Sequence, residues 1–196
     1  MKMHSRHASG DGRRRRLPVL FAVACATTAL LVTATASAGG RASTPALGWT
    51  LQTPYNTTTL YDCAVAGDNS VWAVGNNGTV LYSTNGGASW ASQDVPTVTG
   101  SGDYFLAVSF DAPAQGWAVS QNGAIICLGG AGPIKQTSPS NVALLDVDAV
   151  SANHAWIVGG SGVVLVTADG GTTWTEQTSG TGEPLDGVAF ADLTHG

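Results

Sequence analysis

The stretch LYDCAVAGDNSVWAVGNNGTVLYSTNGGASWASQ at residues 60–93 recurs, with changes, as LLDVDAVSANHAWIVGGSGVVLVTADGGTTWTEQ at residues 144–177. The two stretches align without a gap over their whole length, and Trp90 is matched with Trp174. Self-similarity at a fixed spacing indicates a repeat protein. The offset, 174 − 90 = 84, is twice a period of about 42, so a further copy is expected between these two.

The tryptophans define the same period. One class begins the pattern Trp-x-x-Gln and consists of Trp49, Trp90 and Trp174, with spacings of 90 − 49 = 41 and 174 − 90 = 84. The other class consists of Trp72, Trp117 and Trp156, with spacings of 117 − 72 = 45 and 156 − 117 = 39. Because the spacing is regular, we expect core packing rather than stacking on sugars, and the expected core positions are Trp49, Trp72, Trp117 and Trp156.

The first copy divides into four short segments of β character. These segments are Leu60–Ala66, Val71–Gly75, Thr79–Thr84 and Ser89–Val95. Asn-Gly and Gly-Gly pairs lie between them, and such pairs supply the positive φ angles that tight hairpins require. Four strands in a unit of about 42 residues describe one β-propeller blade, so the sequence predicts an all-β fold.

Residues 48–196 are expected to form an incomplete propeller. The expected pieces are an orphan fourth strand at 48–54, full blades at about 60–95, 104–138 and 144–179, and the start of a further blade at 185–196. The orphan strand would complete a last blade of the ring. Because propellers normally have four to eight blades, these pieces indicate a fragment.

Two copies carry a box with the pattern Ser/Thr-x-Asp-x-Gly-x-x-Trp between their third and fourth strands. The second box comprises Thr167, Asp169, Gly171 and Trp174, and the first has Asn in place of Asp, with Ser83, Asn85, Gly87 and Trp90. The Asp or Asn side chain is expected to accept backbone N–H bonds in the turn, while Gly supplies the special φ. These residues are therefore interpreted as structural.

This box resembles the Asp-box, also called the BNR repeat, and the wider pattern resembles one family that carries it. The run Val71–Gly75, followed by Gly78, Asn85–Gly87 and Trp90, is similar to repeats of the photosystem II stability/assembly factor propellers, and the resemblance covers residues 48–196. It implies an extracytoplasmic, non-catalytic scaffold that binds protein partners, with a role in photosynthesis in part of the family. The basic surface patch of photosynthetic members is not carried over, because only Arg41 and Lys135 are basic after residue 38.

A fragment of a secreted Asp-box glycosidase is the alternative, because sialidases and xyloglucan-degrading enzymes also carry these boxes. A sialidase would need several arginines to clamp its substrate carboxylate, and Arg41 is the only arginine after residue 38. An inverting enzyme would need two facing carboxylates about 6.5–9.5 Å apart. The candidates are Asp62, Asp146 and Asp148. Of these, Asp62 and Asp146 occupy equivalent repeat positions, which favours a repeated structural role.

The N-terminus has the three parts of a secretory signal peptide. Arg13–Arg16 precede an uncharged run over Leu17–Ala38, which ends in the small-x-small motif Ala36-Ser37-Ala38. Residues 1–38 are thus predicted to be a signal peptide and residues 39–47 a short linker, which makes the protein secreted or part of the cell envelope. The alternatives are an uncleaved membrane anchor, since such a run can span a bilayer, and a lipoprotein modified at Cys25.

Composition excludes several classes of function. From residue 39 onward there are 2 basic and 12 acidic residues, a net charge of 2 − 12 = −10, so the basic stripe of a nucleic-acid binder is missing. His154 and His195 have no Cys or His at ligand spacing and are interpreted as turn residues. Cys63 and Cys127 are expected to be buried thiols. No catalytic, cofactor-binding or metal-binding residue is predicted, and a protein partner is expected ahead of a carbohydrate.

Overall fold

The computed structural model describes residues 30–31, 50–51, 58–67, 69–95, 102–112, 115–130 and 132–196. The strands in these ranges are β1 (Leu30–Leu31), β2 (Thr50–Leu51), β3 (Leu60–Val65), β4 (Val71–Gly75), β5 (Val80–Ser83), β6 (Ala91–Ser92), β7 (Phe105–Ala112), β8 (Gln115–Ser120), β9 (Ile125–Leu128), β10 (Ile134–Gln136), β11 (Leu144–Ala149), β12 (Ala155–Gly159), β13 (Val164–Thr167) and β14 (Thr175–Gln177). Two short 3-10 turns, η1 (Asn76–Gly78) and η2 (Gly160–Gly162), follow β4 and β12. Within the described ranges, no helix has the length and apolar character that crossing a bilayer would require.

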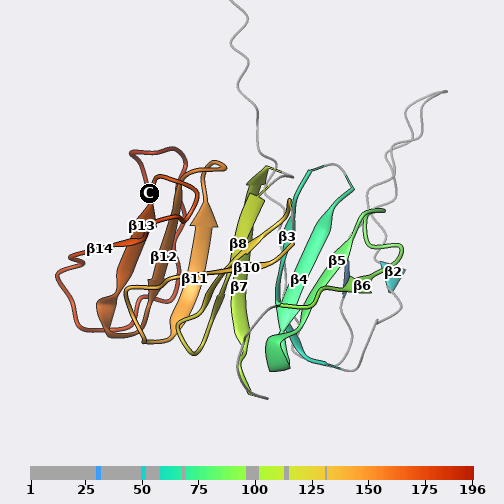
Figure 1. Cartoon of the computed structure of the whole chain (residues 1–196), viewed down its shortest axis with the longest axis horizontal. Coiled ribbons are helices and arrows are strands. Elements are labelled where there is room, and N and C mark those ends of the chain that lie inside the picture. The colour runs from blue at the N-terminus through green and yellow to red at the C-terminus, as the bar shows by residue number, and fades with distance from the viewer. Residues whose placement is uncertain are drawn as a thin grey trace, which may run out of the picture.

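Twelve of the strands form three four-stranded antiparallel sheets, which lie side by side in chain order (Figure 1). We name them blade 1 (β3–β6), blade 2 (β7–β10) and blade 3 (β11–β14), and within each blade every strand pairs with the next one along the chain. The first strands β3, β7 and β11 are neighbours in space. The predicted all-β architecture of four-stranded blades is confirmed.

The hydrophobic core lies between the blades. Blades 1 and 2 share a cluster formed by Val74, Val80, Phe105, Val108, Ala118, Ile126 and Leu128. Blades 2 and 3 share a second cluster, which includes Trp117, Val119, Ile125, Leu144, Ile157, Leu165 and Trp174. Because successive side chains of a strand point to opposite faces, β8 sends Ala118 toward blade 1 and Trp117 toward blade 3. Neighbouring blades thus supply the core that a single blade lacks.

The turns after the second strands need unusual backbone angles. Asn77 in η1 has a φ of 55° and Ser161 in η2 has a φ of 57°, both in the left-handed region. The glycine that follows each of them also has a positive φ, 69° at Gly78 and 71° at Gly162. A side chain at Gly162 would in addition collide with the carbonyl of Thr181. The Asn-Gly and Ser-Gly pairs therefore match the conformation that each hairpin adopts.

The expected orphan strand at 48–54 is described at residues 50–51, and its expected place in a last blade of the ring stays a prediction. Its described part is β2, which pairs with β1 in the register Leu30↔Leu51 and Leu31↔Thr50. Each described blade already has its own fourth strand, so none of these three blades leaves a place for β2. Apart from residues 30–31, the predicted signal peptide and the linker at 39–47 lie outside the described residues.

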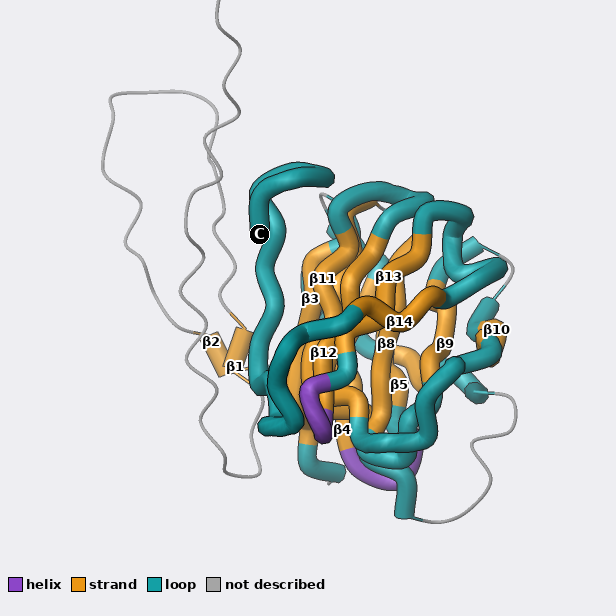
Figure 2. The backbone as a smooth tube through the Cα atoms, turned by 90° about the vertical axis from the view of Figure 1, so that its left-hand side faces the viewer, coloured by secondary structure: helices purple, strands orange, loops and turns teal. Residues whose placement is uncertain are grey.

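The expected first strand within residues 185–196 is not a strand in the structure. In each blade the first strand is hydrogen-bonded to the second, and no such second strand lies beside residues 185–190 within the described chain. The segment is nevertheless extended along blade 3, as the tube that ends at the C label in Figure 2 shows. The fourth strand of blade 1 is also shorter than expected, since β6 spans only Ala91–Ser92, and the backbone N–H of Ser89 bonds to the Asn85 side chain in the preceding turn.

Candidate functional site at the Asp-box turns and the blade interfaces

The first Asp-box is a turn closed by its own side chains. The buried Ser83 hydroxyl at the end of β5 accepts the backbone N–H of Gly87 at 2.8 Å and donates to the Asn85 Oδ1 at 2.9 Å. The same Oδ1 accepts the backbone N–H of Ser89 at 2.9 Å, and the Asn85 amide donates to the Ser89 hydroxyl. Asn therefore performs the accepting role of the Asp that the motif specifies.

The second Asp-box repeats this arrangement with a charged acceptor. The buried Thr167 hydroxyl accepts the backbone N–H of Gly171 at 2.9 Å and donates to the Asp169 Oδ1. The Asp169 carboxylate accepts the hydroxyl of Thr173 at 2.6 Å and its backbone N–H at 2.9 Å. These two bonds from Thr173, the hydroxyl first, lower the pKa of Asp169. With its carboxylate engaged inside the turn, Asp169 has a structural role in this geometry.

The glycines of the boxes have backbone angles that suit glycine. Gly87 has a φ of 89° and Gly171 a φ of 80°. A Cβ at Gly171 would also overlap the side-chain amide of Gln136, which belongs to blade 2. The second box is thus both a hairpin turn and a contact point with the preceding blade.

Gln136 joins two tryptophans across the interface between blades 2 and 3. Its Oε1 accepts the indole N–H of Trp117 and the indole N–H of Trp174, each at 3.0 Å. Its Nε2 donates to the carbonyl of Gly170 at 2.9 Å. The two indole rings meet edge to face with centroids 6.1 Å apart, a favourable arrangement for aromatic pairs. Trp117 is fully buried and Trp174 is 7% exposed.

Of the other four tryptophans, two form stacked pairs, one is half-buried, and one lies outside the described residues. Trp72 stacks on Phe110 of the next blade at a centroid distance of 5.4 Å, and Trp156 stacks on Phe190 at 4.0 Å. Trp90 is half-buried beside its box. Trp49 lies outside the described residues, so its expected core position stays a prediction.

Each of the three candidate carboxylates accepts a backbone N–H from the segment beside its own strand, which is β7 for Asp62 and residues 188–190 for Asp146 and Asp148. Oδ2 of Asp62 accepts the N–H of Val108 at 2.8 Å, and its Oδ1 accepts the N–H of Cys63. Asp146 repeats this pattern with Val188 at 2.8 Å and with its own neighbour Val147.

Asp148 extends the same pattern by accepting the N–H of Phe190 at 2.6 Å. Between blades 2 and 3, the hydroxyl of Ser109 takes the equivalent part and accepts the N–H of Ala149 at 3.0 Å. Side chains of one first strand therefore accept backbone N–H groups of the segment that lies beside it, which is β7, β11 or residues 188–190.

Burial is the main cause of the shifted pKa values among the side chains of the first strands. It raises the pKa of Asp62 from 3.8 to about 6, although the N–H groups of Val108 and Cys63 oppose the rise. The pKa of Asp146 is raised for the same reason. Burial also raises the pKa of the Cys63 thiol to about 11, and Cys63 and Cys127 are both free and half-buried. No group of three or more metal-binding side chains occurs within the described part of the chain.

Two of the three described blades carry an Asp-box turn, and a family model matches most of the chain that these blades occupy. The model described as "Photosynthesis system II assembly factor YCF48" matches residues 43–128 and 133–192. The chain belongs to this family. The resemblance inferred from the repeat motif is thereby confirmed. The comparison with curated proteins gives no match.

Two solved structures of YCF48 resemble the chain. "YCF48 bound to D1 peptide" has a TM-score of 0.56 and 22% identity, over 65% of this chain and 47% of that chain. "YCF48 from Cyanidioschyzon merolae" has a TM-score of 0.56 and 27% identity, over 63% of this chain and 41% of that chain. The chain thus spans less than half the length of either structure, and the first of them shows the shared fold alone.

Gln136 is the residue of this region that sequence reasoning missed. It pairs with Ile125 in blade 2, as Gln177 pairs with Val164 in blade 3, so it is the glutamine of the Trp-x-x-Gln pattern. The middle copy lacks the tryptophan of that pattern, which hides the equivalence. Aligning the copies by the pairing of their third and fourth strands, instead of by the tryptophan, identifies Gln136 as the equivalent of Gln177.

Proposed function

We propose that the chain is an exported, non-catalytic scaffold that binds a protein partner during the assembly or stabilisation of a protein complex. The observation that carries this proposal is the match to the assembly-factor family over residues 43–128 and 133–192. The blades are four-stranded hydrogen-bonded sheets, and loops on such a frame are natural docking sites. Export is supported by the Arg13–Arg16 run and the uncharged segment that follows it.

The contacts of the carboxylates support a non-catalytic role. Asp62 and Asp146 each use one oxygen to accept a backbone N–H of the neighbouring segment, from Val108 and Val188, and the other oxygen to accept the N–H of the next residue in their own strand. An inverting glycosidase instead needs one carboxylate to activate water and one to protonate the leaving group across an open gap. The glycosidase alternative is therefore not favoured.

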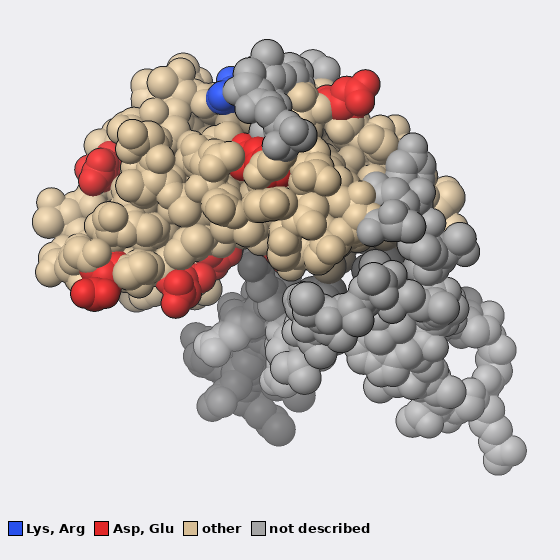
Figure 3. Space-filling view, turned by 90° about the horizontal axis from the view of Figure 1, so that it is seen from below, with Lys and Arg blue, Asp and Glu red and all other residues tan. Residues whose placement is uncertain are grey.

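The class of partner is supported by the D1 peptide that accompanies YCF48 in one solved structure. The charge of this chain favours a partner with a basic surface. Lys135 is the one Lys or Arg among the described residues, and Figure 3 shows acidic side chains scattered over the face seen from below. A net charge of 2 − 12 = −10 after residue 38 favours association with positively charged surfaces.

Two assays on the full-length chain test this proposal. In the first, the purified protein is incubated with xyloglucan and with a sialylated glycan, and no sugar release above that of heat-denatured protein is expected. In the second, the protein is cross-linked in the cell envelope, and the captured partner is purified and titrated at low and at high salt. Saturable binding that weakens with salt is expected.

Sugar release that disappears in an Asp146→Asn variant would overturn the non-catalytic assignment. A purified partner that binds equally well to heat-denatured protein would overturn the proposal that the folded chain is a binding scaffold. Intact mass of the envelope-associated product tests export, with a mature chain that begins at Gly39 as the expected result.

A further inference from the structure

The segment after β14 reproduces the start of a blade without its second strand. Val188 donates its N–H to Asp146 of blade 3 at 2.8 Å, as Val108 donates to Asp62 of blade 1 at 2.8 Å. Phe190 stacks on Trp156, as Phe110 stacks on Trp72. Residues 185–190 therefore lie against blade 3 as β7 lies against β3.

The turn that follows this segment has the form of a blade hairpin. The N–H of Ala191 donates to the carbonyl of His195 at 2.8 Å, and in blade 3 the N–H of Val150 donates to the carbonyl of His154 at 2.9 Å. In blade 3 this bond is followed directly by the second strand, which begins at Ala155.

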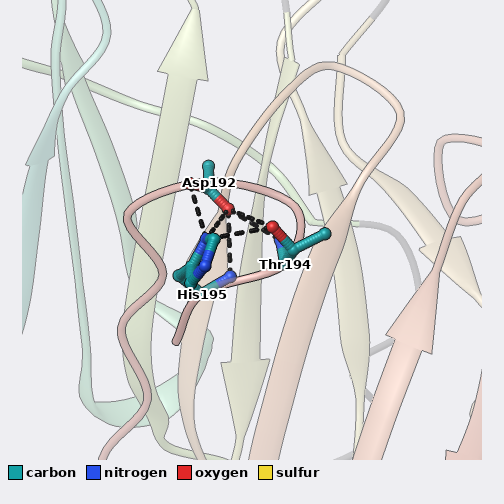
Figure 4. Close-up of polar contacts among 3 residues, drawn as sticks. All are labelled: Asp192, Thr194 and His195. Atoms are coloured by element: carbon teal, nitrogen blue, oxygen red, sulfur yellow. Dashed lines mark hydrogen bonds and ion pairs between the residues drawn. The ribbon is translucent and has the colours of Figure 1, made fainter.

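The side chains that close the two turns are equivalent as well. Oδ1 of Asp192 accepts the N–H groups of Thr194 and His195, and Nδ1 of His195 lies 2.9 Å from it (Figure 4). In blade 3 the hydroxyl of Ser151 accepts the N–H groups of Asn153 and His154. The hydrogen bonds from the Thr194 backbone first, and then from its hydroxyl, lower the pKa of Asp192, so the turn favours the ionised form of this carboxylate.

The position opposite Phe190 is also filled as in a complete blade. Gly196 follows Phe190 in the chain as the sixth residue after it, and a Cβ on Gly196 would meet the Phe190 ring. In blade 2, Gly116 is the register partner of Phe110, and a Cβ there would meet the Phe110 ring in the same way. The chain at Gly196 is thus in register to pair with residues 185–190.

The open edge of this segment has unused backbone groups. Because successive N–H groups of an extended chain alternate in direction, Gly187 and Ala189 point away from the edge that Asp146 and Asp148 occupy. Within the described residues no partner is present for either N–H. The adjoining face of blade 3 is incompletely covered, since Val164 is half-buried whereas its equivalent Val80 is 1% exposed under blade 2.

We propose that residues 185–190 are a preformed edge that accepts one antiparallel β-strand of the pattern found in β4, β8 and β12, entering directly beyond the turn at 191–196. The register Ser109↔Trp117 and Ala107↔Val119 of blade 2 places the aromatic residue of the added strand opposite Ala189 and its valine opposite Gly187. Small or apolar residues between these positions face blade 3, as Ala118 faces blade 1. This edge is independent of the protein partner proposed above.

Hydrogen exchange on the full chain tests this edge. The chain is compared with a version that carries Trp-Ala-Val-Ser-Gln, the sequence of residues 117–121, after Gly196. A tethered strand acts at an effective concentration of about millimolar or more. We expect the exchange of the Gly187 and Ala189 amides to slow by at least tenfold, while that of the Val188 amide, already bonded to Asp146, changes little.

Two proline variants of the added sequence are matched controls. Proline in place of its valine removes an N–H on the paired edge and should abolish the protection. Proline in place of its alanine removes an N–H on the outer edge, which an edge strand tolerates, and should preserve it. Equal exchange of Gly187 and Ala189 in the natural, extended and both proline chains would overturn the proposal, as would equal protection by both proline variants. No protein partner takes part, so failure here is distinct from failure of the proposed function.

Discussion

Replacement of Gln136 by Met removes the acceptor shared by two tryptophans and keeps a side chain of similar volume. Gln136 accepts from the indoles of Trp117 and Trp174 at 3.0 Å each and donates to the Gly170 carbonyl at 2.9 Å. The Gly170 carbonyl retains a second donor, Nε2 of Gln115 at 3.1 Å. The variant therefore leaves two indole N–H groups as the main unpaired polar groups at this interface.

The magnitude follows from the burial of these two groups. A buried donor without a partner costs about 1–3 kcal/mol. Trp117 is fully buried, so its donor should lie toward the upper part of that range, whereas Trp174 is 7% exposed and retains some access to water. We expect Gln136→Met to lower the free energy of unfolding by about 3 kcal/mol. For a chain of this size the melting temperature should fall by roughly 6–12 °C.

Urea unfolding followed by tryptophan fluorescence measures this change, and Gln177→Met is the matched control. Gln177 occupies the same register position in blade 3 as Gln136 in blade 2, but its side chain is exposed. An exposed substitution away from special features should change stability by no more than about 0.5 kcal/mol. The two variants thus make the same substitution at equivalent positions of the repeat. They differ in the burial and in the contacts of the amide that is removed.

A result in which both variants unfold at the same urea concentration would refute the role assigned to Gln136. The double variant with Trp174→Phe sharpens the test. Trp174→Phe removes one of the donors that depend on Gln136, so it should cost less in the Gln136→Met background than alone, by about 0.5–3 kcal/mol of coupling energy. Strict additivity would show that the two side chains do not interact.

Three further predictions concern single residues. Trp174→Ala should lower the free energy of unfolding by about 3–5 kcal/mol, as buried aromatic deletions do, and an unchanged urea midpoint would contradict the blade assignment. The raised pKa of Asp62 means that folding favours its protonated form, so its contribution to stability is complete below pH 3.8 and is lost as the pH rises through about 6. Asp62→Asn should flatten the pH dependence of unfolding between about pH 4 and 6.5, by up to about 3 kcal/mol, and an unchanged slope in urea titrations would speak against it. Cys63, with its thiol pKa raised to about 11, should react with a disulfide reagent at pH 8 roughly 100-fold more slowly than an exposed cysteine, and equal rates would show that the thiol is accessible and ionised.

The repeat and its turns could be predicted from the sequence because their contacts are local. Ser83 reaches Gly87 and Thr167 reaches Gly171, in each case over four positions along the chain. Separations of this kind are the same in every copy, so one short motif is enough to specify the turn. The family match followed from the same local pattern, since the tryptophans and glycines that mark the turns also mark the blades.

The contacts that hold the blades together could not be read in this way. Gln136 meets Trp174 across 38 positions, and Asp62 meets Val108 across 46. Equivalent residues differ from blade to blade, with Ser109 at one interface and Asp148 at another, because any acceptor of suitable reach can satisfy an open strand edge. In the middle copy the sequence pattern is too altered to show which residues are equivalent, and the pairing of its strands is needed to identify them.

Residues 185–190 show both sides of this division. Their composition marks a first strand of a blade, and that information is local. Whether they become a strand depends on a second strand beside them, since a β-strand is defined by hydrogen bonds to a neighbour. The amino-acid order thus determines the blade period, the hairpin turns and the apolar faces, whereas the stacking of blades decides which carboxylates become acceptors and which edge stays open.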